Sequence, residues 1–496
     1  MLLVWLIIIP VLGAVLAWLA QRLGPGWSRW LSLAAIVAEA IVLAALPPAG
    51  DPWLVEFRVP WVPALGIGFH LAVDGLSVVL LWLTVAMAGA AVLVSWREIS
   101  RRVGFFHFNL LLSVAGIVGV FLALDLFLFF VFWEVMLVPM VLLIALWGHE
   151  NRLYAATKFF IFTQAGSLLM LVAIVAMAIV HSHDHEGLSF AYADMLALSL
   201  EPATARWLML GFFVAFAVKL PIVPLHTWLP DAHTEAPTAG SVLLAAVLLK
   251  TGAYGLLRFA LPLFPEASAA FAPVAMGLGA LAVIYGAVLA FAQDDMKRLV
   301  AYTSVSHMGF VLLGIYAMND LALRGSVMQL VAHGLSTAAL FTIVGMIQER
   351  WHTRDLRRLG GLWASLPRLS GFTMLFALAS LGLPGLANFV AEFLILAGAF
   401  QAHWPLTVIA ALGLVGAALY ALLMVQRSLW GEFRPAMAKP DCSWRELVIL
   451  TSLAVAIIYF GVRPQPVLER ATVPTVPSSA DIAPPVAAAN DDGGAP

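Results

Sequence analysis

The sequence predicts an all-α polytopic membrane protein with about 14 transmembrane helices. Charged residues make up 11% of its 496 residues and apolar types 62%, whereas a soluble domain carries about 25% charged residues. The apolar residues form long runs between short polar clusters, and about 20 apolar residues cross the hydrocarbon core of a bilayer. With a net charge of −2, the composition excludes a soluble domain, a disordered chain, a coiled coil and a nucleic-acid-binding protein.

The individual spans follow when the chain is divided at its polar clusters, prolines and glycines. They lie near residues 2–20, 30–46, 76–95, 105–123, 126–147, 155–180, 206–222, 239–263, 269–292, 299–318, 323–348, 368–401, 405–430 and 444–462. The first span has no basic region before it and is long enough to cross, so we expect a retained helix; a cleaved signal peptide is the alternative. Residues 463–496 are rich in proline and alanine and lack an apolar period, which predicts a disordered tail.

The distribution of basic residues predicts the orientation. Loops after odd-numbered spans contain 18 of the 26 Lys and Arg residues, and the opposite loops contain six, Arg258 among them. Because cytoplasmic loops are enriched in Lys and Arg, we expect both termini on the side away from the cytoplasm. The loop 294–298, which includes Lys297, is expected to cap the cytoplasmic interface. The two remaining basic residues, Lys219 and Lys250, lie inside spans.

Two segments interrupt the helical pattern at membrane depth. KLPIVPLHTWLPDAHTEAPTAGS (219–241) and SLGLPGLANFVAEF (380–393) both contain proline, which removes helix hydrogen bonds. Non-helical backbone is tolerated in a membrane where protein covers it or where it lines a wet cavity, so each break indicates an internal polar path. The breaks lie five spans apart, and paired broken helices are typical of transporter repeats.

Six ionisable residues lie inside the predicted spans, where a charge costs about 2.5 to 3.5 kcal/mol. They are Glu134, Lys219, Lys250, His307, His333 and Glu392. Glu134 has no basic residue nearby in its own helix, so its partner must come from another helix. Lys219 is the natural counter-ion, and its ammonium is also expected to satisfy the backbone carbonyls that the following proline frees.

Lys250 lies too deep in its span to reach either surface. A lysine whose carboxylate partner moves away can bind and release a proton near neutral pH. His307 and His333 titrate in the same range, and nearby hydroxyl groups can hold a chain of water. These hydroxyls belong to Ser304, Ser306, Ser336 and Thr337. Together these groups supply the elements of a proton path.

Several polar residues have a plainer interpretation as satisfied groups that join two helices. We prefer it for Glu39, for Asp125 and, taken singly, for His333. The histidines of HSHDHEG (181–187) are suited to a divalent metal, but we prefer a solvated loop between spans. The single Cys442 excludes a disulfide framework and a cysteine-ligated iron–sulfur cluster, so redox chemistry would lie in other chains.

The first broken segment belongs to a longer motif. KLPIVPLHTWLPDAHTEAPTAGSVLLAAVLLKTGAYGLLRF, followed by QDDMKRLVAYTSVSHMG, resembles the signature of the antiporter-like subunits of respiratory complex I and of the related multisubunit cation/proton antiporters. VDGLS at residues 73–77 and LPGLANFVAEF in the twelfth span are similar to the same family. The resemblance extends over residues 1–462 and leaves out the tail.

The resemblance implies about 14 helices that contain two inverted five-helix repeats. The chain would then divide into five parts. These are N-terminal helices (1–104), a first repeat (105–263), a second repeat (269–430), a last helix (444–462) and the tail (463–496).

The family also implies a role for each buried ionisable residue. Glu134 and Lys219 would form the coupled pair of one half-channel, and Lys250 would be the central relay. Glu392 would be the terminal group of the other half-channel, connected to Lys250 through the two buried histidines. Sibling subunits more usually have lysine at the position of Glu392, and one sibling carries a long lateral helix that this chain lacks. The sequence therefore resembles the branch of this family that has glutamate at the position of Glu392.

This resemblance implies a proton-translocating subunit of an NADH:quinone oxidoreductase in the bacterial inner membrane, without a redox centre of its own. FMN, iron–sulfur clusters and quinone would belong to partner subunits, and neighbouring antiporter-like membrane subunits would be its partners. Two alternatives stay open. One is a cation/proton exchanger that uses the same residues, and the other is a cytochrome-type electron carrier with His307 and His333 as its only candidate haem ligands.

Overall fold

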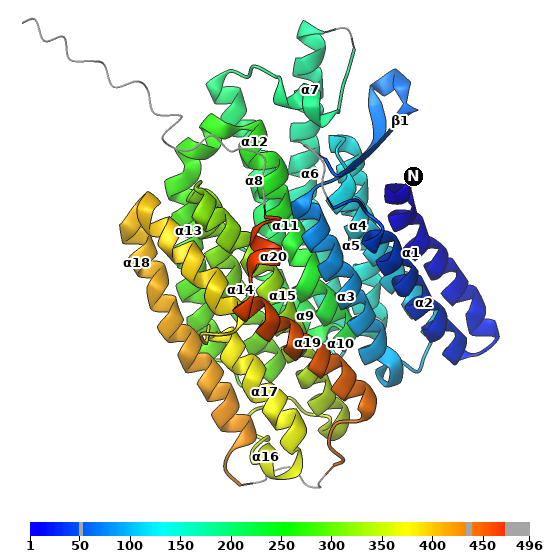
Figure 1. The fold of residues 1–496 in the computed structure, drawn as a ribbon, viewed down its shortest axis with the longest axis vertical. Helices are drawn as coiled ribbons and strands as arrows, with labels where there is room; N and C mark the ends of the chain where they lie inside the picture. Colours follow the sequence, from blue (N-terminus) through cyan, green and yellow to red (C-terminus); the bar gives the residue numbers. More distant parts are fainter. Residues whose placement is uncertain (49–52, 186, 433–438, 472–496) are drawn as a thin grey trace, which may run out of the picture.

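Long helices lie side by side in the computed structural model (Figure 1), which describes residues 1–48, 53–185, 187–432 and 439–471. The longer helices are α1 (Leu2–Leu19), α2 (Pro25–Ala44), α3 (Gly75–Glu98), α4 (Val103–Leu122), α5 (Leu126–Trp147), α6 (Arg152–Asp184), α8 (Pro202–Lys219), α13 (Pro265–Phe291), α14 (Met296–Tyr316), α15 (Asp320–Trp351), α17 (Pro367–Ser380), α18 (Ala387–Leu429) and α19 (Trp444–Val462). The short α-helices are α7 (Tyr192–Leu196), α9 (Trp228–Glu235), α10 (Thr238–Leu243), α11 (Leu249–Gly255), α12 (Leu261–Leu263), α16 (Leu362–Ser365) and α20 (Gln465–Leu468). The remaining elements are the 3₁₀ turns η1 (Ala20–Arg22) and η2 (Pro63–Leu65), the π-helical turns η3 (Leu244–Leu248) and η4 (Leu256–Ala260), and the strands β1 (Val55–Val62) and β2 (Ile67–Val73).

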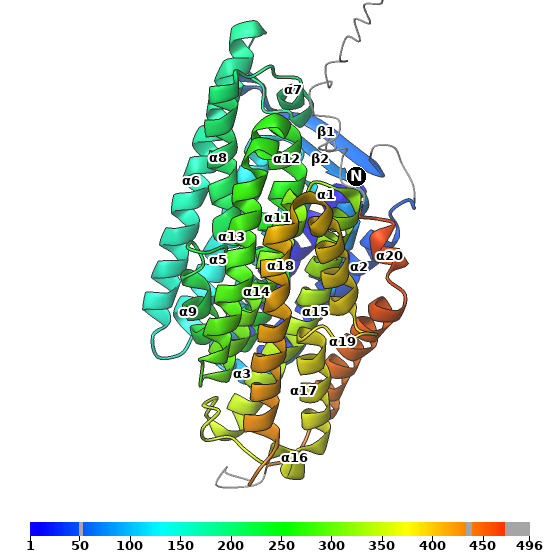
Figure 2. The same ribbon diagram turned by 90° about the vertical axis from the view of Figure 1, so that its left-hand side faces the viewer.

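The predicted fold class is confirmed. Within the described ranges, twelve helices are long and apolar enough to cross a membrane, with α10 to α12 counted as one segment, Thr238–Leu263. α18 is also counted once, although its backbone leaves the helical region at His403 (φ −155°, ψ 81°) and its two limbs lie side by side (Figure 2). The predicted span 368–401 corresponds to α17 and the first limb of α18, and the predicted span 405–430 corresponds to the second limb of α18. The number of 14 crossings stays a prediction.

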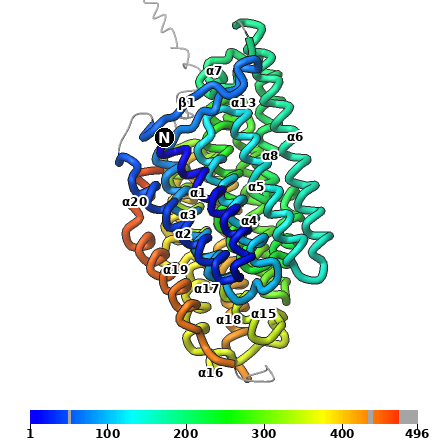
Figure 3. Tube along the Cα trace, turned by 90° about the vertical axis from the view of Figure 1, so that its right-hand side faces the viewer, coloured from blue at the N-terminus to red at the C-terminus, as the bar shows by residue number. Residues whose placement is uncertain are grey.

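The middle of the bundle is buried by the chain itself. The most apolar stretch of Thr238–Leu263 is 100% buried and those of α14 and α15 are 94% buried, whereas those of α6 and α18 are only 39% buried. Figure 3 shows α1, α2 and α4 together at one side of the bundle, where α1 contacts both of the others. Outward faces rich in exposed apolar side chains suit lipid or a neighbouring membrane subunit, so the enclosed segments are the place for polar chemistry.

A two-stranded antiparallel hairpin, which the sequence did not predict, lies at the end of the bundle near the N-terminus (Figure 1). Asp125 connects this hairpin to the helices. Its carboxylate accepts from the backbone N–H of Gly68 in β2 at 3.0 Å and from those of Phe127 and Leu128 in the first turn of α5. Asp125 is therefore a satisfied group, as predicted, but it joins a strand to the helix that it caps and not two helices.

Both predicted breaks are present. α8 ends at Lys219 because Pro221 cannot continue the helical hydrogen bonds. The indole of Trp228 donates to the carbonyl of Val218 at 2.9 Å, which satisfies a group near the break. The second break separates α17 from α18, where Gly382 adopts a φ of +80°. The division into two inverted repeats stays a prediction.

The sequence predicts disorder from residue 463, but the chain remains folded beyond this point. α20 forms at Gln465–Leu468 and contacts α15, and Val467 and Ala471 are buried. Few side chains in this stretch are apolar, and packing against α15 and α19 stabilises it, so no local pattern indicates the helix. The predicted disorder of residues 472–496 lies outside the described residues.

Candidate functional site

Lys250 lies on α11 and is fully buried. Its ammonium donates to the carbonyl of Ala245 at 2.5 Å and lies 2.7 Å from Nδ1 of His333 on α15. Ala245 belongs to the π-helical turn η3, and π-helical turns are frequent at functional sites. The lysine is thus held by a carbonyl and an imidazole, and no described carboxylate forms an ion pair with it.

His307, on α14, lies in a second buried cluster. Its Nδ1 is 3.1 Å from Oε1 of Glu392 on α18, and its Nε2 is 3.2 Å from the hydroxyl of Ser380 and 3.3 Å from that of Tyr420. Gln329 of α15 donates to the same oxygen of Glu392 at 3.3 Å. These partners lower the cost of placing a carboxyl group inside a membrane protein.

The two clusters are in contact through their histidines. The ring centroids of His333 and His307 lie 5.5 Å apart, with the rings edge to face. Lys250, His333, His307 and Glu392 therefore form one continuous series of ionisable side chains, which we call the central row. The structure brings together the four residues that the resemblance connects. The ring contact also leaves no space for a haem between the two imidazoles.

The expected ion pair between Glu134 and Lys219 is not formed. Nζ of Lys219 and Oε1 of Glu134 are buried, and neither has a hydrogen-bond partner in the described part of the chain. The ammonium lies 5.3 Å from the ring centre of Trp133 and 5.5 Å from that of Phe159, which is cation–π geometry. Glu134 is close enough for its charge to act on Lys219. The prediction that Lys219 satisfies the carbonyls at the break is also wrong, because the carbonyl of Ala217 accepts from the backbone N–H of Ile222 and that of Val218 from the indole of Trp228.

Two glycines allow the helices of the site to approach one another. A Cβ on Gly252, two residues after Lys250, would lie 2.6 Å from the carbonyl oxygen of Phe216 on α8. A Cβ on Gly382 would lie 2.8 Å from Oε2 of Glu392. Glycine is therefore required where α8 meets α11 and where the second break meets the end of the central row.

Sequence reasoning missed the neutral members of the second cluster, Gln329, Ser380 and Tyr420. None of them carries a charge, so hydropathy does not distinguish them from the apolar residues around them. One signal was present: Gln329 precedes His333 by four residues, and this spacing puts both on one face of a helix.

Two basic residues that the sequence places in loops are buried. Arg258 lies in η4, fully buried, in an ion pair with Asp74, which also caps the N-terminus of α3. Lys297, in the first turn of α14, is 1% exposed and donates to the carbonyl of Ala236 at 2.5 Å. The predicted interfacial cap is therefore wrong for Lys297. A polar cluster beside a span has the pattern of a loop even where other helices cover it.

The structure also tests the interpretations of Glu39 and of the histidine-rich segment 181–187. Glu39 is 1% exposed, and neither carboxylate oxygen has a hydrogen-bond partner among the described residues, so it is not the satisfied joining group that we expected. In segment 181–187, the rings of His181 and His185 stack 4.4 Å apart. The described residues contain no group of three potential metal-ligating side chains, and residue 186 lies outside them. The geometry gives the metal site no support.

The sequence of this chain is similar to those of known proteins over most of its length. The family model described as NADH:quinone oxidoreductase/Mrp antiporter, TM matches residues 123–419. The chain is 53% identical over 486 residues to NADH-quinone oxidoreductase subunit M of Pseudomonas aeruginosa and 51% identical over 487 residues to that of Escherichia coli. Each alignment covers 95% of this chain and 96% of the relative.

Solved structures share its fold. A chain of respiratory complex I from Thermus thermophilus, determined with bound NADH, is 32% identical with a TM-score of 0.86, covering 95% of this chain and 98% of that chain. A chain of the Mrp complex from Dietzia sp. is 26% identical with a TM-score of 0.83, covering 95% of this chain and 52% of that chain. The high identity to subunit M confirms the branch that Glu392 indicates. The chain therefore belongs to the NADH:quinone oxidoreductase/Mrp antiporter family, in the group of NADH-quinone oxidoreductase subunit M.

Proposed function

We propose that this chain carries protons across the bacterial inner membrane as a subunit of NADH-quinone oxidoreductase, and that the central row is the path. Lys250, His333, His307 and Glu392 each exchange a proton, and successive members lie at hydrogen-bond or ring-contact distance. The four side chains of the row are all buried inside the protein, so charge moves along the row without contact with lipid.

Imidazole suits the middle of such a path. A neutral imidazole accepts a proton at one ring nitrogen and releases one from the other, which moves a proton across the ring. Nδ1 of His333 is within reach of the Lys250 ammonium. Both ring nitrogens of His307 have a partner that exchanges protons, Glu392 on one side and the hydroxyls of Ser380 and Tyr420 on the other.

The separated pair of Glu134 and Lys219 controls how readily Lys250 holds a proton. An ammonium without a carboxylate partner repels a proton on Lys250, and movement of Glu134 toward Lys219 weakens that repulsion. α8, which ends at Lys219, and α11, which carries Lys250, pack closely at Gly252. The driving force comes from quinone reduction in partner subunits, which carry FMN, iron–sulfur clusters and quinone, while this chain supplies only proton-exchanging groups.

The charged end of the bundle indicates the orientation within this proposal. At the end that carries α16, away from the N-terminus (Figure 1), Arg354 pairs with Asp295, and Lys158 and Arg298 pair with Asp231. Because Lys and Arg are enriched in cytoplasmic loops, this end faces the cytoplasm and both termini face the periplasm. An N-terminal epitope should react with antibody on spheroplasts and not on inverted vesicles; the reverse result would contradict the orientation.

A cation/proton exchanger is the second candidate, favoured by the fold shared with the Mrp complex chain. The 53% identity to subunit M, against 26% to the Mrp chain, supports the first candidate. Exchange of Na⁺ for protons that needs no NADH would favour the exchanger. NADH-driven proton transport that is independent of Na⁺ favours the oxidoreductase subunit.

Substitution of Lys250 tests the path. In inverted membrane vesicles, Lys250→Ala should lower NADH-driven acidification about 10²-fold, the scale of losing one proton-transfer group. Lys250→Arg should fail as well, because a guanidinium keeps the charge but does not release its proton. Lys439→Ala, in the loop before α19, is the control, and NADH oxidation by an artificial acceptor measures assembly. Unchanged acidification in Lys250→Ala would refute the path.

A further inference from the structure

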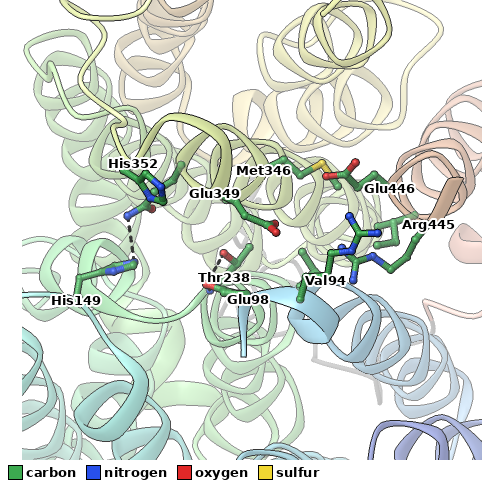
Figure 4. A pocket seen from close by; sticks show the side chains of 13 residues that line it. Val94, Glu98, His149, Thr238, Met346, Glu349, His352, Arg445 and Glu446 are labelled. Atoms are coloured by element: carbon green, nitrogen blue, oxygen red, sulfur yellow. Dashed lines mark hydrogen bonds between the residues drawn. The ribbon is translucent and has the colours of Figure 1, made fainter. Parts of the chain in front are cut away.

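A cavity of about 330 Å³ with several charged side chains in its wall lies at the end of α3, α15 and α19 that carries the basic loops (Figure 4). Arg97, Glu98, Glu349 and Arg445 contribute charges to its wall, and Thr238 of α10 lies at its inner side. The cavity is partly open to the surface and large enough for a group of water molecules. None of the residues of the central row lines it.

Charged side chains hold the junction between α9 and α10 at this inner wall. The Glu98 carboxylate accepts from the backbone N–H and the hydroxyl of Thr238, both at 2.9 Å, and so caps the N-terminus of α10. Lys297 donates to the carbonyl of Ala236 at 2.5 Å, and Arg354 donates to that of Thr234 at 2.8 Å, at the C-terminus of α9. An anion at a helix N-terminus and cations at a C-terminus both stabilise the helix dipoles.

His233, on α9, has no assigned role. Its side chain is fully buried, and neither ring nitrogen has a hydrogen-bond partner in the described ranges. The ring stacks on Phe341 of α15 at 4.5 Å, and Lys297 and Lys250 are both close enough for their charges to act on it. Leaving buried polar groups unpaired costs free energy, so such an imidazole needs a reason to be there.

We propose that the cavity is the proton inlet of the central row, and that Glu98 and Lys297 close it by holding the junction at 236–238 in front of His233. This inference rests on the proposed function. When Lys297 releases the carbonyl of Ala236, water from the cavity reaches His233, whose two free ring nitrogens then pass a proton toward Lys250. Glu98 and Lys297 are positioning residues here, and His233 is the carrier.

The geometry also connects this inlet to the far end of the row. Lys297 and His307 both lie on α14, so one helix contacts the junction at its first turn and Glu392 at its middle. A shift of α14 therefore changes both contacts at once. Proton entry from the cavity into the central row is therefore coupled to the His307–Glu392 contact through one rigid helix, α14.

The test measures access to position 233 rather than turnover. In the assembled complex with Cys442→Ala, His233→Cys is exposed to a charged methanethiosulfonate applied from either face of oriented vesicles. It is compared alone, with Lys297→Ala and with Lys297→Arg. Glu349→Cys reports that the reagent reaches the cavity. His107→Cys, on α4, is the matched control, because His107 is also fully buried with both ring nitrogens unpaired among the described residues.

We expect His233→Cys to react slowly, and to react about tenfold faster with Lys297→Ala, a factor that corresponds to about 1.4 kcal/mol. The acceleration should occur only from the face of the basic loops and should disappear with Lys297→Arg. Equal rates with and without Lys297→Ala, or equal acceleration of His107→Cys, would overturn the inlet. If pumping is lost in Lys250→Ala, either of these results refutes the inlet and leaves the proposed function standing. Intact pumping in Lys250→Ala would refute the proposed function, and the inlet with it.

Discussion

Replacing Gly252 by alanine tests whether the close approach of α8 to α11 matters for proton transfer. The added Cβ would lie 2.6 Å from the carbonyl oxygen of Phe216 and 2.9 Å from the backbone nitrogen of Leu220. Ordinary contact begins at 3.4 Å, so the backbone of α8 must withdraw by about 0.8 Å. Overpacking of this kind costs about 1 to 3 kcal/mol, and the helix propensity of alanine offsets about 1 kcal/mol. We expect a net destabilisation of at most about 2 kcal/mol.

Function should suffer more than stability in this variant. α8 ends at Lys219, so its withdrawal changes the distance between this ammonium and that of Lys250, and a misplacement of about 1 Å can lower a rate about 10²-fold. The assays are NADH-driven acidification of inverted vesicles and the temperature at which the purified complex loses activity. Gly277→Ala on α13 is the matched control, because no atom lies within 4 Å of its added Cβ. Equal acidification by Gly252→Ala and Gly277→Ala would refute the reasoning.

Three further predictions concern other parts of the structure. Glu392→Gln should lower NADH-driven acidification about 10²-fold, whereas Tyr420→Phe, which removes one of two hydroxyls at the neighbouring histidine, should lower it about fivefold or less; similar losses in both variants would contradict this ranking. Asp74→Ala leaves the buried Arg258 without its carboxylate, which should cost about 3 to 5 kcal/mol and is measured as a lower inactivation temperature of the purified complex. His149 lies in the loop between α5 and α6, where burial and two nearby cations lower its pKa to about 4. The unfolded chain therefore binds more protons than the folded one below pH 6.5, and the stability of this loop should fall as the pH drops from 6.5 toward 4. Amide hydrogen exchange of the loop checks this, and His149→Gln should show no such fall.

The architecture could be predicted because hydropathy and proline act over a few residues. An apolar run must be long enough to cross the bilayer wherever it lies in the fold, and a proline interrupts a helix whatever packs against it. The breaks at 219–241 and 380–393 were therefore visible in the sequence. The ionisable residues inside spans were visible for the same reason, since a charge among apolar neighbours has a cost that local composition reveals.

The contacts of the candidate site were only partly predictable. The connection of Lys250 to Glu392 through two histidines came from a family resemblance, not from the spacing of these residues. Gln329 and Tyr420 escaped notice because they carry no charge. The hairpin of β1 and β2 was missed, since it is held at the end of the bundle by contacts with distant residues such as Asp125.

Local patterns in the sequence are enough to predict a polytopic helical membrane protein with two broken helices and a few buried ionisable groups. Which of these groups meet depends on how the helices pack. The tertiary structure joined four of them in the central row, kept Glu134 apart from Lys219, and buried Lys297 and Arg258, which the local pattern assigns to loops. The reason is physical: crossing the bilayer is a property of a segment, whereas burial and pairing of a charge depend on the elements that pack around it.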